Sequence, residues 1–291
     1  MEQNLFDYYR TFSQFTYPGL YQENFQRDLP TDIGQAGRLV KQQVIHSLSL
    51  SASREGVQTN PAYGNIREVP WYRQGEDDYF PTAVAMLAEL YRRDPRGFVP
   101  DRAVENKLII TCRAVAILMA TILKTRGIPT RVRAGYAPYI RSDRMETHWI
   151  TQYRHTPEKR WITIDADTSL ENRPFDPFDM PPETFHFGAN AWLAVREGRQ
   201  NASLLIEDGR SALENLARLL FFDFHALMNN EVTYTQVPIF IAIDFNTVEE
   251  EKLQEIDALA CLLQQPDENF AQLQTLWETR RDFRLLHGSL V

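Results

Sequence analysis

The sequence predicts an α+β fold in which one apolar helix packs on a sheet of antiparallel strands. Apolar residues recur at helical spacing after Cys112 and stop at Gly127. Three segments rich in Val, Ile, Thr and aromatic residues then follow one another, at residues 130–140, 148–154 and 160–167. A helix followed by successive strands is typical of an α+β domain, whereas alternating helices and strands would predict a parallel sheet.

The chain before this region has an irregular start and two helical patterns. Residues 1–35 are aromatic and interrupted by prolines and glycines, so we expect an ordered arm with short helices. A helical pattern covers residues 37–50, and the composition of residues 51–65 indicates a loop. After Pro81, apolar residues recur at helical spacing until Asp94 ends the pattern.

The helix that begins at Cys112 has an apolar face and a C-terminal signal. The residues predicted to share that face are Val115, Leu118, Met119, Ile122 and Leu123. Lys124 and Arg126 precede Gly127, the residue type that most often ends a helix. The residues HTPEK, 155–159, then predict a turn between the last two strands.

The C-terminal part of the chain is mainly helical by pattern. Residues 211–231 and 247–287 are predicted to form helices, and VPIFIAI, residues 237–243, a short strand or buried segment. We expect one compact unit, because no internal repeat or low-complexity linker interrupts the sequence. Its three regions would be an N-terminal arm (residues 1–65), a catalytic core (66–170) and a mainly helical extension packed on that core (171–291).

The composition excludes several classes of protein. With 39 acidic and 31 basic residues the formal net charge is −8, which argues against nonspecific binding to nucleic acid or to an anionic membrane. The N-terminus lacks the pattern of a signal peptide, and no apolar run approaches the roughly 18 residues of a membrane helix. Two cysteines provide no disulfide framework, so we expect a cytoplasmic protein.

Three residues form a candidate catalytic set. Cys112 stands at the start of its helix, where the helix dipole lowers the pKa of a thiol and a backbone N–H can stabilise an oxyanion. His148 opens one predicted strand and Asp165 lies near the end of the next. If those strands pair across the turn, the two side chains become cross-strand neighbours, as nucleophilic catalysis requires. Taken singly, each residue is more often a core cysteine, a surface histidine or a turn-forming aspartate.

Other candidates have weaker patterns. His155, His186 and His225 are rival bases, but none begins a strand that leads into an aspartate-bearing partner. Cys261 has apolar neighbours at helical spacing, so we expect it to be inert. The sequence contains no HExxH, no CxxC pair, no Walker loop and no GxGxxG motif, so we expect neither a metal nor a cofactor.

The segments CRAVAILMATILKTRGIPTRVRAGY, THWITQY and RWITIDAD resemble the three motifs of the transglutaminase-like superfamily, including bacterial members with a C-terminal extension. The resemblance implies a papain-like α+β core in which Cys112, His148 and Asp165 form a triad. It also implies cysteine-dependent transfer of an acyl group from an amide or thioester to an amine or water, without calcium. Alternatives are an amide-forming enzyme that uses carrier-protein thioesters, a cysteine amidase or peptidase, and a catalytically idle binding platform.

Further residues are candidates for substrate binding. The family resemblance suggests Trp71 as a second oxyanion donor, although a rim or core tryptophan is the commoner role. Arg113 could bind an acidic group or serve a structural ion pair, and Tyr136 and Trp149, with Tyr139, could form aromatic walls. A basic cluster could dock an acyl carrier protein or could be solvated charge. Its members are Lys124, Arg126, Arg131, Arg133, Arg141 and Arg144.

Overall fold

The computed structural model describes residues 2–54, 56, 60–74, 76, 79–141, 146–202 and 210–287. Its backbone contacts divide the chain into two compact units. The α6 unit comprises Asp7–Arg131 and Trp149–Pro181, and the α8 unit comprises Met1–Phe6, Val132–His148 and Pro182–Val291. The predicted division into arm, core and extension uses other boundaries and stays a prediction.

The α6 unit is built from helices, two short parallel strands and part of a β-hairpin. Its elements before the hairpin are α2 (Gln22–Asp28), α3 (Ile33–Gln42), β1 (Val44–His46), α4 (Ser47–Arg54), α5 (Ala83–Arg93), β2 (Leu108–Ile110) and α6 (Cys112–Thr125). Helix α1 (Glu2–Arg10) begins in the α8 unit and ends in this one. The helices predicted after Pro81 and from Cys112 are therefore confirmed.

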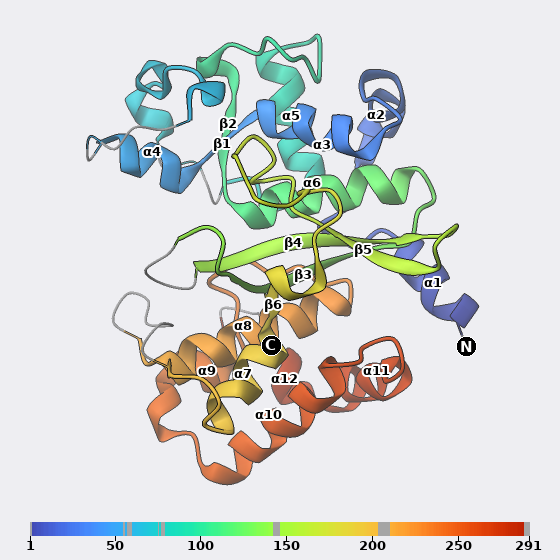
Figure 1. The fold of residues 1–291 in the computed structure, drawn as a ribbon, viewed down its shortest axis with the longest axis vertical. Coiled ribbons are helices and arrows are strands. Elements are labelled where there is room, and N and C mark those ends of the chain that lie inside the picture. The colour runs from blue at the N-terminus through green and yellow to red at the C-terminus, as the bar shows by residue number, and fades with distance from the viewer. Residues whose placement is uncertain are drawn as a thin grey trace. The chain divides into compact units, whose positions relative to one another are not determined.

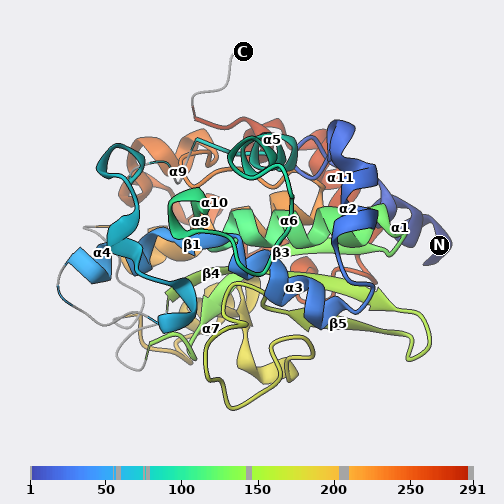
Figure 2. The same cartoon turned by 90° about the horizontal axis from the view of Figure 1, so that it is seen from above.

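Helix α6 is the centre of its unit. It packs against α2, α3 and α5, which surround it in Figures 1 and 2. The residues of the predicted apolar face belong to one core cluster, and every residue from Cys112 to Lys124 is buried, so the helix is covered on its other sides as well. The small residues between the predicted apolar positions, Ala114, Ala116 and Ala120, allow neighbouring elements to approach the helix on its other sides.

A short strand interrupts the helical pattern predicted for residues 37–50. Helix α3 ends at Gln42, and Val44 and Ile45 continue as β1, fully buried. Strand β1 pairs in parallel with β2, with His46 opposite Ile110. The correction has a physical cause: β-branched residues that find a partner strand gain more from sheet pairing than from continuing a helix.

The three strands predicted after α6 are confirmed, and the strand pairs whose register is established are antiparallel. The strands are β3 (Thr130–Ala137), β4 (Glu146–His155), β5 (Arg160–Ile164) and β6 (His186–Phe187), in the order β5-β4-β3-β6. Strands β4 and β5 pair antiparallel across a turn at the predicted residues 155–159. The fold is therefore α+β, as predicted (Figure 1).

The C-terminal part of the α8 unit is helical. Its helices are α7 (Gly188–Arg196), α8 (Ala212–Leu227), α9 (Ile239–Asp244), α10 (Glu250–Leu263), α11 (Phe270–Thr279) and α12 (Arg281–Arg284). Gly188 lets α7 approach α8 closely, because an added Cβ would lie 2.9 Å from the carbonyl oxygen of Leu219. VPIFIAI does not form a strand: Pro238 is the N-cap of helix α9 there. Val237 and Ile241 are buried, as the alternative prediction expected, whereas Ile243 is 75% exposed.

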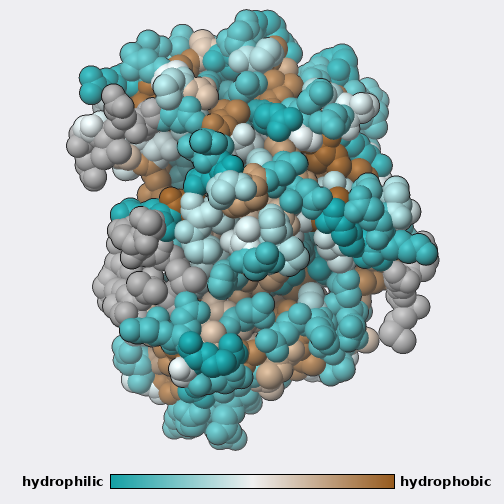
Figure 3. Space-filling view, in the orientation of Figure 1, coloured by the Kyte–Doolittle hydropathy of each residue, from teal (hydrophilic) through white to brown (hydrophobic). Residues whose placement is uncertain are grey.

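The surface is mixed in character. Hydrophilic residues cover most of the face seen in Figure 3, and hydrophobic residues are scattered among them. Within the described ranges, no helix combines the length and apolar composition needed to cross a lipid bilayer.

Candidate active site

Cys112 is the first residue of α6, as predicted. Strand β2 ends at Ile110, and Thr111, in extended conformation, accepts hydrogen bonds from the backbone N–H groups of Ala114 and Val115 at 3.0 and 3.2 Å. Cys112 is 4% exposed. The N–H groups of a first helical turn point out of the helix end, which carries the positive end of the dipole. The thiol therefore lies where a thiolate and an oxyanion are both stabilised.

A buried carboxylate fixes the strand that leads to Cys112. Glu76 is 3% exposed and accepts a hydrogen bond from the backbone N–H of Ile109, in β2, at 2.9 Å. The guanidinium groups of Arg73 and Arg93 also bind this carboxylate. Burial alone would raise the pKa of Glu76, but the hydrogen bonds from Arg73 and Arg93 outweigh it and lower that pKa. No sequence pattern indicates this network, because its members lie far from Cys112 along the chain.

Asp165 is fully buried directly after strand β5. Its carboxylate accepts hydrogen bonds from the Oγ1 hydroxyl of Thr168 at 2.8 Å and from the backbone N–H of Thr168 at 3.3 Å. Its own backbone N–H donates to the carbonyl oxygen of Pro177 at 2.7 Å. These contacts hold the carboxylate in one orientation, which suits a group that must orient an imidazole.

His148 is the last residue of its segment in the α8 unit and is 2% exposed. Its ring meets that of Tyr139 edge to face, with centroids 6.3 Å apart, and that of Phe185 at 6.5 Å. Aromatic contacts on two sides restrict how the imidazole can rotate. The predicted base is therefore a buried, packed side chain and not a solvated strand-end histidine.

Asp167, two residues after Asp165, belongs to a second set of charged residues that was not predicted from the sequence. Asp167 binds the Nζ ammonium of Lys41 at 2.5 Å, and both side chains are buried. His46 lies on the same carboxylate, with Nε2 3.7 Å from Oδ2. The carboxylate of Asp167 is therefore already bound by a lysine, unlike a carboxylate that is free to orient an imidazole.

The predicted substrate-binding residues occupy different environments. Trp71 is 83% exposed, and its ring contacts the ring of its neighbour Tyr72 edge to face. Arg113 is buried, donates to the carbonyl oxygen of Pro81 at 3.2 Å and stacks on an aromatic ring, which is the structural role weighed against substrate binding. Tyr136 and Trp149 are each 1% exposed. Their roles in substrate binding stay predictions.

The rival histidines have other partners. His155 is half-buried at the end of β4, and its Nδ1 lies 3.2 Å from the Glu158 carboxylate. His186 is half-buried in β6 and pairs with β3. His225 is fully buried in α8, with Nε2 2.9 Å from the carbonyl oxygen of Phe283. All three have structural surroundings that account for them.

The predicted basic cluster does not form an exposed patch. Lys124, Arg131 and Arg133 are each at most 4% exposed, and Arg133 forms a bidentate ion pair with the buried Asp223 at 2.7 and 2.8 Å. Arg126 binds backbone carbonyls of the loop before α3. Arg141 lies near a glutamate at 3.5 Å, and Arg144 falls outside the described residues. Most of these charges are therefore engaged in structural contacts, and binding of an acyl carrier protein stays a prediction without this surface as support.

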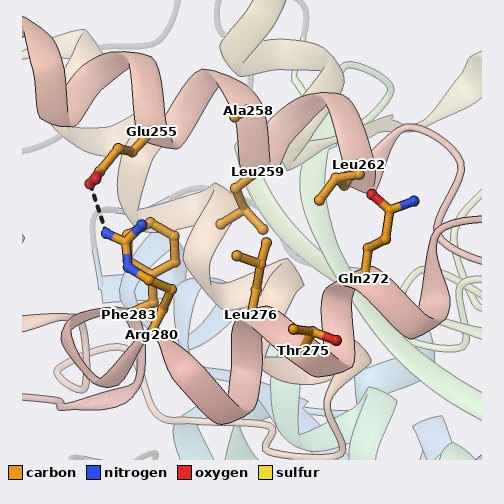
Figure 4. A pocket seen from close by; sticks show the side chains of 9 residues that line it. All are labelled: Glu255, Ala258, Leu259, Leu262, Gln272, Thr275, Leu276, Arg280 and Phe283. Carbon is orange, nitrogen blue, oxygen red and sulfur yellow. Dashed lines mark hydrogen bonds and ion pairs between the residues drawn. The ribbon is translucent and has the colours of Figure 1, made fainter.

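Two cavities of the α8 unit are lined by residues other than the candidate catalytic residues. One, of about 390 Å³, lies between α10 and α11, with three leucines among its lining residues and the Glu255–Arg280 pair at one end (Figure 4). The other, of about 220 Å³, lies beside α8 and includes Arg210 and Arg218. Neither is lined by His148, the candidate base in the same unit.

Comparison with known proteins identifies the region that holds the candidate residues. Residues 82–166 match the family model of the transglutaminase-like superfamily. No curated protein and no solved structure matches the chain. The match runs from α5 to the residue after Asp165 and so contains all three candidate residues. The resemblance noted in the sequence is confirmed over residues 82–166, which are similar to the core of the transglutaminase-like superfamily.

Proposed function

We propose that the protein is a cysteine-dependent acyltransferase in which Cys112 is the nucleophile, His148 the base and Asp165 the residue that orients His148. The observation that carries this proposal is the position of Cys112. It is the first residue of a buried helix within the segment that matches the superfamily. At a helix start the dipole favours the thiolate form of a cysteine, which is the form that acts as a nucleophile.

The proposed bond changes take place between these side chains and the two substrates. His148 accepts the thiol proton as the sulfur of Cys112 bonds to the carbonyl carbon of an amide or thioester. The tetrahedral intermediate collapses with cleavage of the C–N or C–S bond, and the imidazolium returns the proton to the leaving amine or thiol. An amine or water then attacks the thioester and releases the acyl group and the Cys112 thiol. Asp165 stabilises the imidazolium without taking its proton.

Contacts within the α6 unit support this arrangement. Thr151 of β4 donates its Oγ1 hydroxyl to the carbonyl oxygen of Ala116, in the second turn of α6, at 3.1 Å. Further along the strand, the backbone N–H of Arg154 donates to the carbonyl oxygen of Pro129, beyond the other end of the helix. Strand β4 therefore runs antiparallel to α6.

The register of the hairpin supports Asp165 as the partner of His148. Thr151 pairs with Ile164, the last residue of β5. Continued by one pair, this register sets Asp165 across from Ile150, which is two residues from His148 along β4. Residues two apart on a strand share a face. The order of the motifs in the sequence and this register therefore favour the same pair.

We favour an amine as acceptor over water. Transfer to an amine requires that water be kept from the thioester, and buried aromatic residues such as Tyr136 and Trp149 are suited to that. Trp71, exposed as it is, contributes less to this preference. A carrier-protein thioester remains one class of donor, although the predicted basic surface no longer argues for it.

Intact-protein mass spectrometry tests the proposal. The protein is incubated with amide donors and with small acyl thioesters, and the adduct is then chased with amines. A Cys261→Ser variant is the matched background, because Cys261 is exposed and would add unrelated label. We expect an acyl adduct that is lost in Cys112→Ser and that decays faster when an amine is present.

Each other outcome has a definite meaning. An adduct that decays equally fast with and without amine would make the protein a hydrolase. An adduct formed only from carrier-bound thioesters would assign the donor to an acyl carrier protein. No adduct from any donor would contradict acyl transfer and favour a binding platform.

A further inference from the structure

His46 and Cys112 follow the same edge of the two-stranded sheet. Strands β1 and β2 are parallel, and His46, the last residue of β1, pairs with Ile110, the last residue of β2. Cys112 comes two residues later. Neighbouring strands lie about 4.8 Å apart, and two residues span about 7 Å, so the two backbones are close. The carboxyl ends of parallel strands are the edge at which α/β sheets bind ligands.

The side chain of His46 is on the α6 side of this sheet. Val44 and Ile110 belong to the core cluster that also contains Ala114 and Val115 of α6. His46 shares the face of Val44, because residues two apart on a strand point the same way. The side chain is 14% exposed, so it lies at the margin of that cluster and not within it. A ligand at the start of α6 would meet it.

Contacts of the imidazole fix the position of its proton. The backbone N–H of Leu48 donates to Nδ1 at 3.1 Å, so Nδ1 is an acceptor and the ring proton is on Nε2. Nε2 faces Oδ2 of Asp167, but at 3.7 Å that separation is too long for a hydrogen bond. The charge of Asp167 is instead balanced by Lys41 at 2.5 Å. The Nε2–H group of His46 is therefore presented as a neutral donor.

We propose that His46 is the second oxyanion donor of the Cys112 site. In this role, which rests on the proposed acyl transfer, Nε2–H of His46 and the backbone N–H of Cys112 hydrogen-bond the carbonyl oxygen as it becomes negative. Asp167, whose carboxylate is bound by Lys41, lies beside the imidazole without a hydrogen bond to it. The family resemblance suggested Trp71 as the second oxyanion donor, but the side chain of Trp71 is 83% exposed. His46 acts as a donor and not as a base, because Nδ1 is occupied.

Two reagents separate this role from a structural one. p-Nitrophenyl acetate acylates a thiolate through an oxyanion, whereas iodoacetamide alkylates it by direct displacement without one. Both rates are measured in a Cys261→Ser background for the wild-type residue, His46→Ala and His46→Gln. Glutamine keeps an N–H donor near the position of Nε2. We expect His46→Ala to lower acylation by about 100-fold with alkylation unchanged, and His46→Gln to restore most of the loss.

Every outcome decides the proposal. Equal acylation in all three proteins would overturn the role of His46 and leave acyl transfer by Cys112 intact. An equal fall in both rates would also overturn it, because His46 would then act on the thiol. If the unsubstituted Cys112 reacts with neither reagent faster than a free small-molecule thiol, acyl transfer itself is contradicted, and the role of His46 with it.

Discussion

Acidification is expected to destabilise the α8 unit through His225. This side chain is fully buried, its Nε2 donates to the carbonyl oxygen of Phe283 and its Nδ1 accepts from the amide of Asn230, so both nitrogens are satisfied in the neutral form. Burial lowers the pKa of His225 from 6.5 to about 4. Between these values the unfolded chain binds a proton that the folded chain does not. Stability is therefore complete above pH 6.5 and is lost as the pH falls towards 4.

The gap between the two pKa values corresponds to about 3 kcal/mol, because one pKa unit is worth about 1.4 kcal/mol. Urea unfolding followed by circular dichroism at pH 7 and at pH 4.5 measures the change. His225→Gln should lose this part of the pH dependence, and His287→Gln, an exposed histidine of the same unit, should keep it. An identical acid-induced loss in wild type and His225→Gln would refute the reasoning.

Three further substitutions have defined outcomes. Glu76→Gln should lower the free energy of unfolding by about 3–5 kcal/mol in urea titrations, because it removes one partner of a buried ion-pair network. A loss below about 1 kcal/mol would show that the network does not stabilise the fold. Gly135→Ala should cost about 1–3 kcal/mol, since the new Cβ would lie 2.3 Å from the carbonyl oxygen of His186, and an unchanged melting temperature would count against that packing. Asp165→Asn should lower acyl-transfer turnover by about 10⁴-fold with the melting temperature nearly unchanged, and near-normal turnover would remove Asp165 from the site.

Elements with local signals were predictable from the sequence. Helix α6 was predicted from its apolar periodicity, and the hairpin of β4 and β5 from two alternating segments joined by a short turn. Both signals lie within a short stretch of sequence. The same locality led to the candidate residues, because Cys112, His148 and Asp165 mark the ends of these elements. The family match covers this part of the chain, residues 82–166, and confirms the family resemblance there.

Features that depend on distant pairing could not be predicted. Strand β1 exists because β2, more than sixty residues later, pairs with it, and without a partner its residues continue a helical pattern. Lys41 and Asp167 are 126 residues apart in the chain, yet they form a buried ion pair. Arginines that look like a surface cluster in the sequence are buried against partners such as Asp223, ninety residues from Arg133. Such pairs become visible only in the folded chain.

The central claim is that Cys112 is an activated nucleophile, and its alkylation rate tests that claim most directly. Iodoacetamide modification at neutral pH is followed by mass spectrometry in the Cys261→Ser background, with a small-molecule thiol as reference. We predict that Cys112 reacts faster than the reference and that His148→Ala removes the advantage. A rate no higher than that of the reference thiol, unaltered by His148→Ala, would contradict the claim.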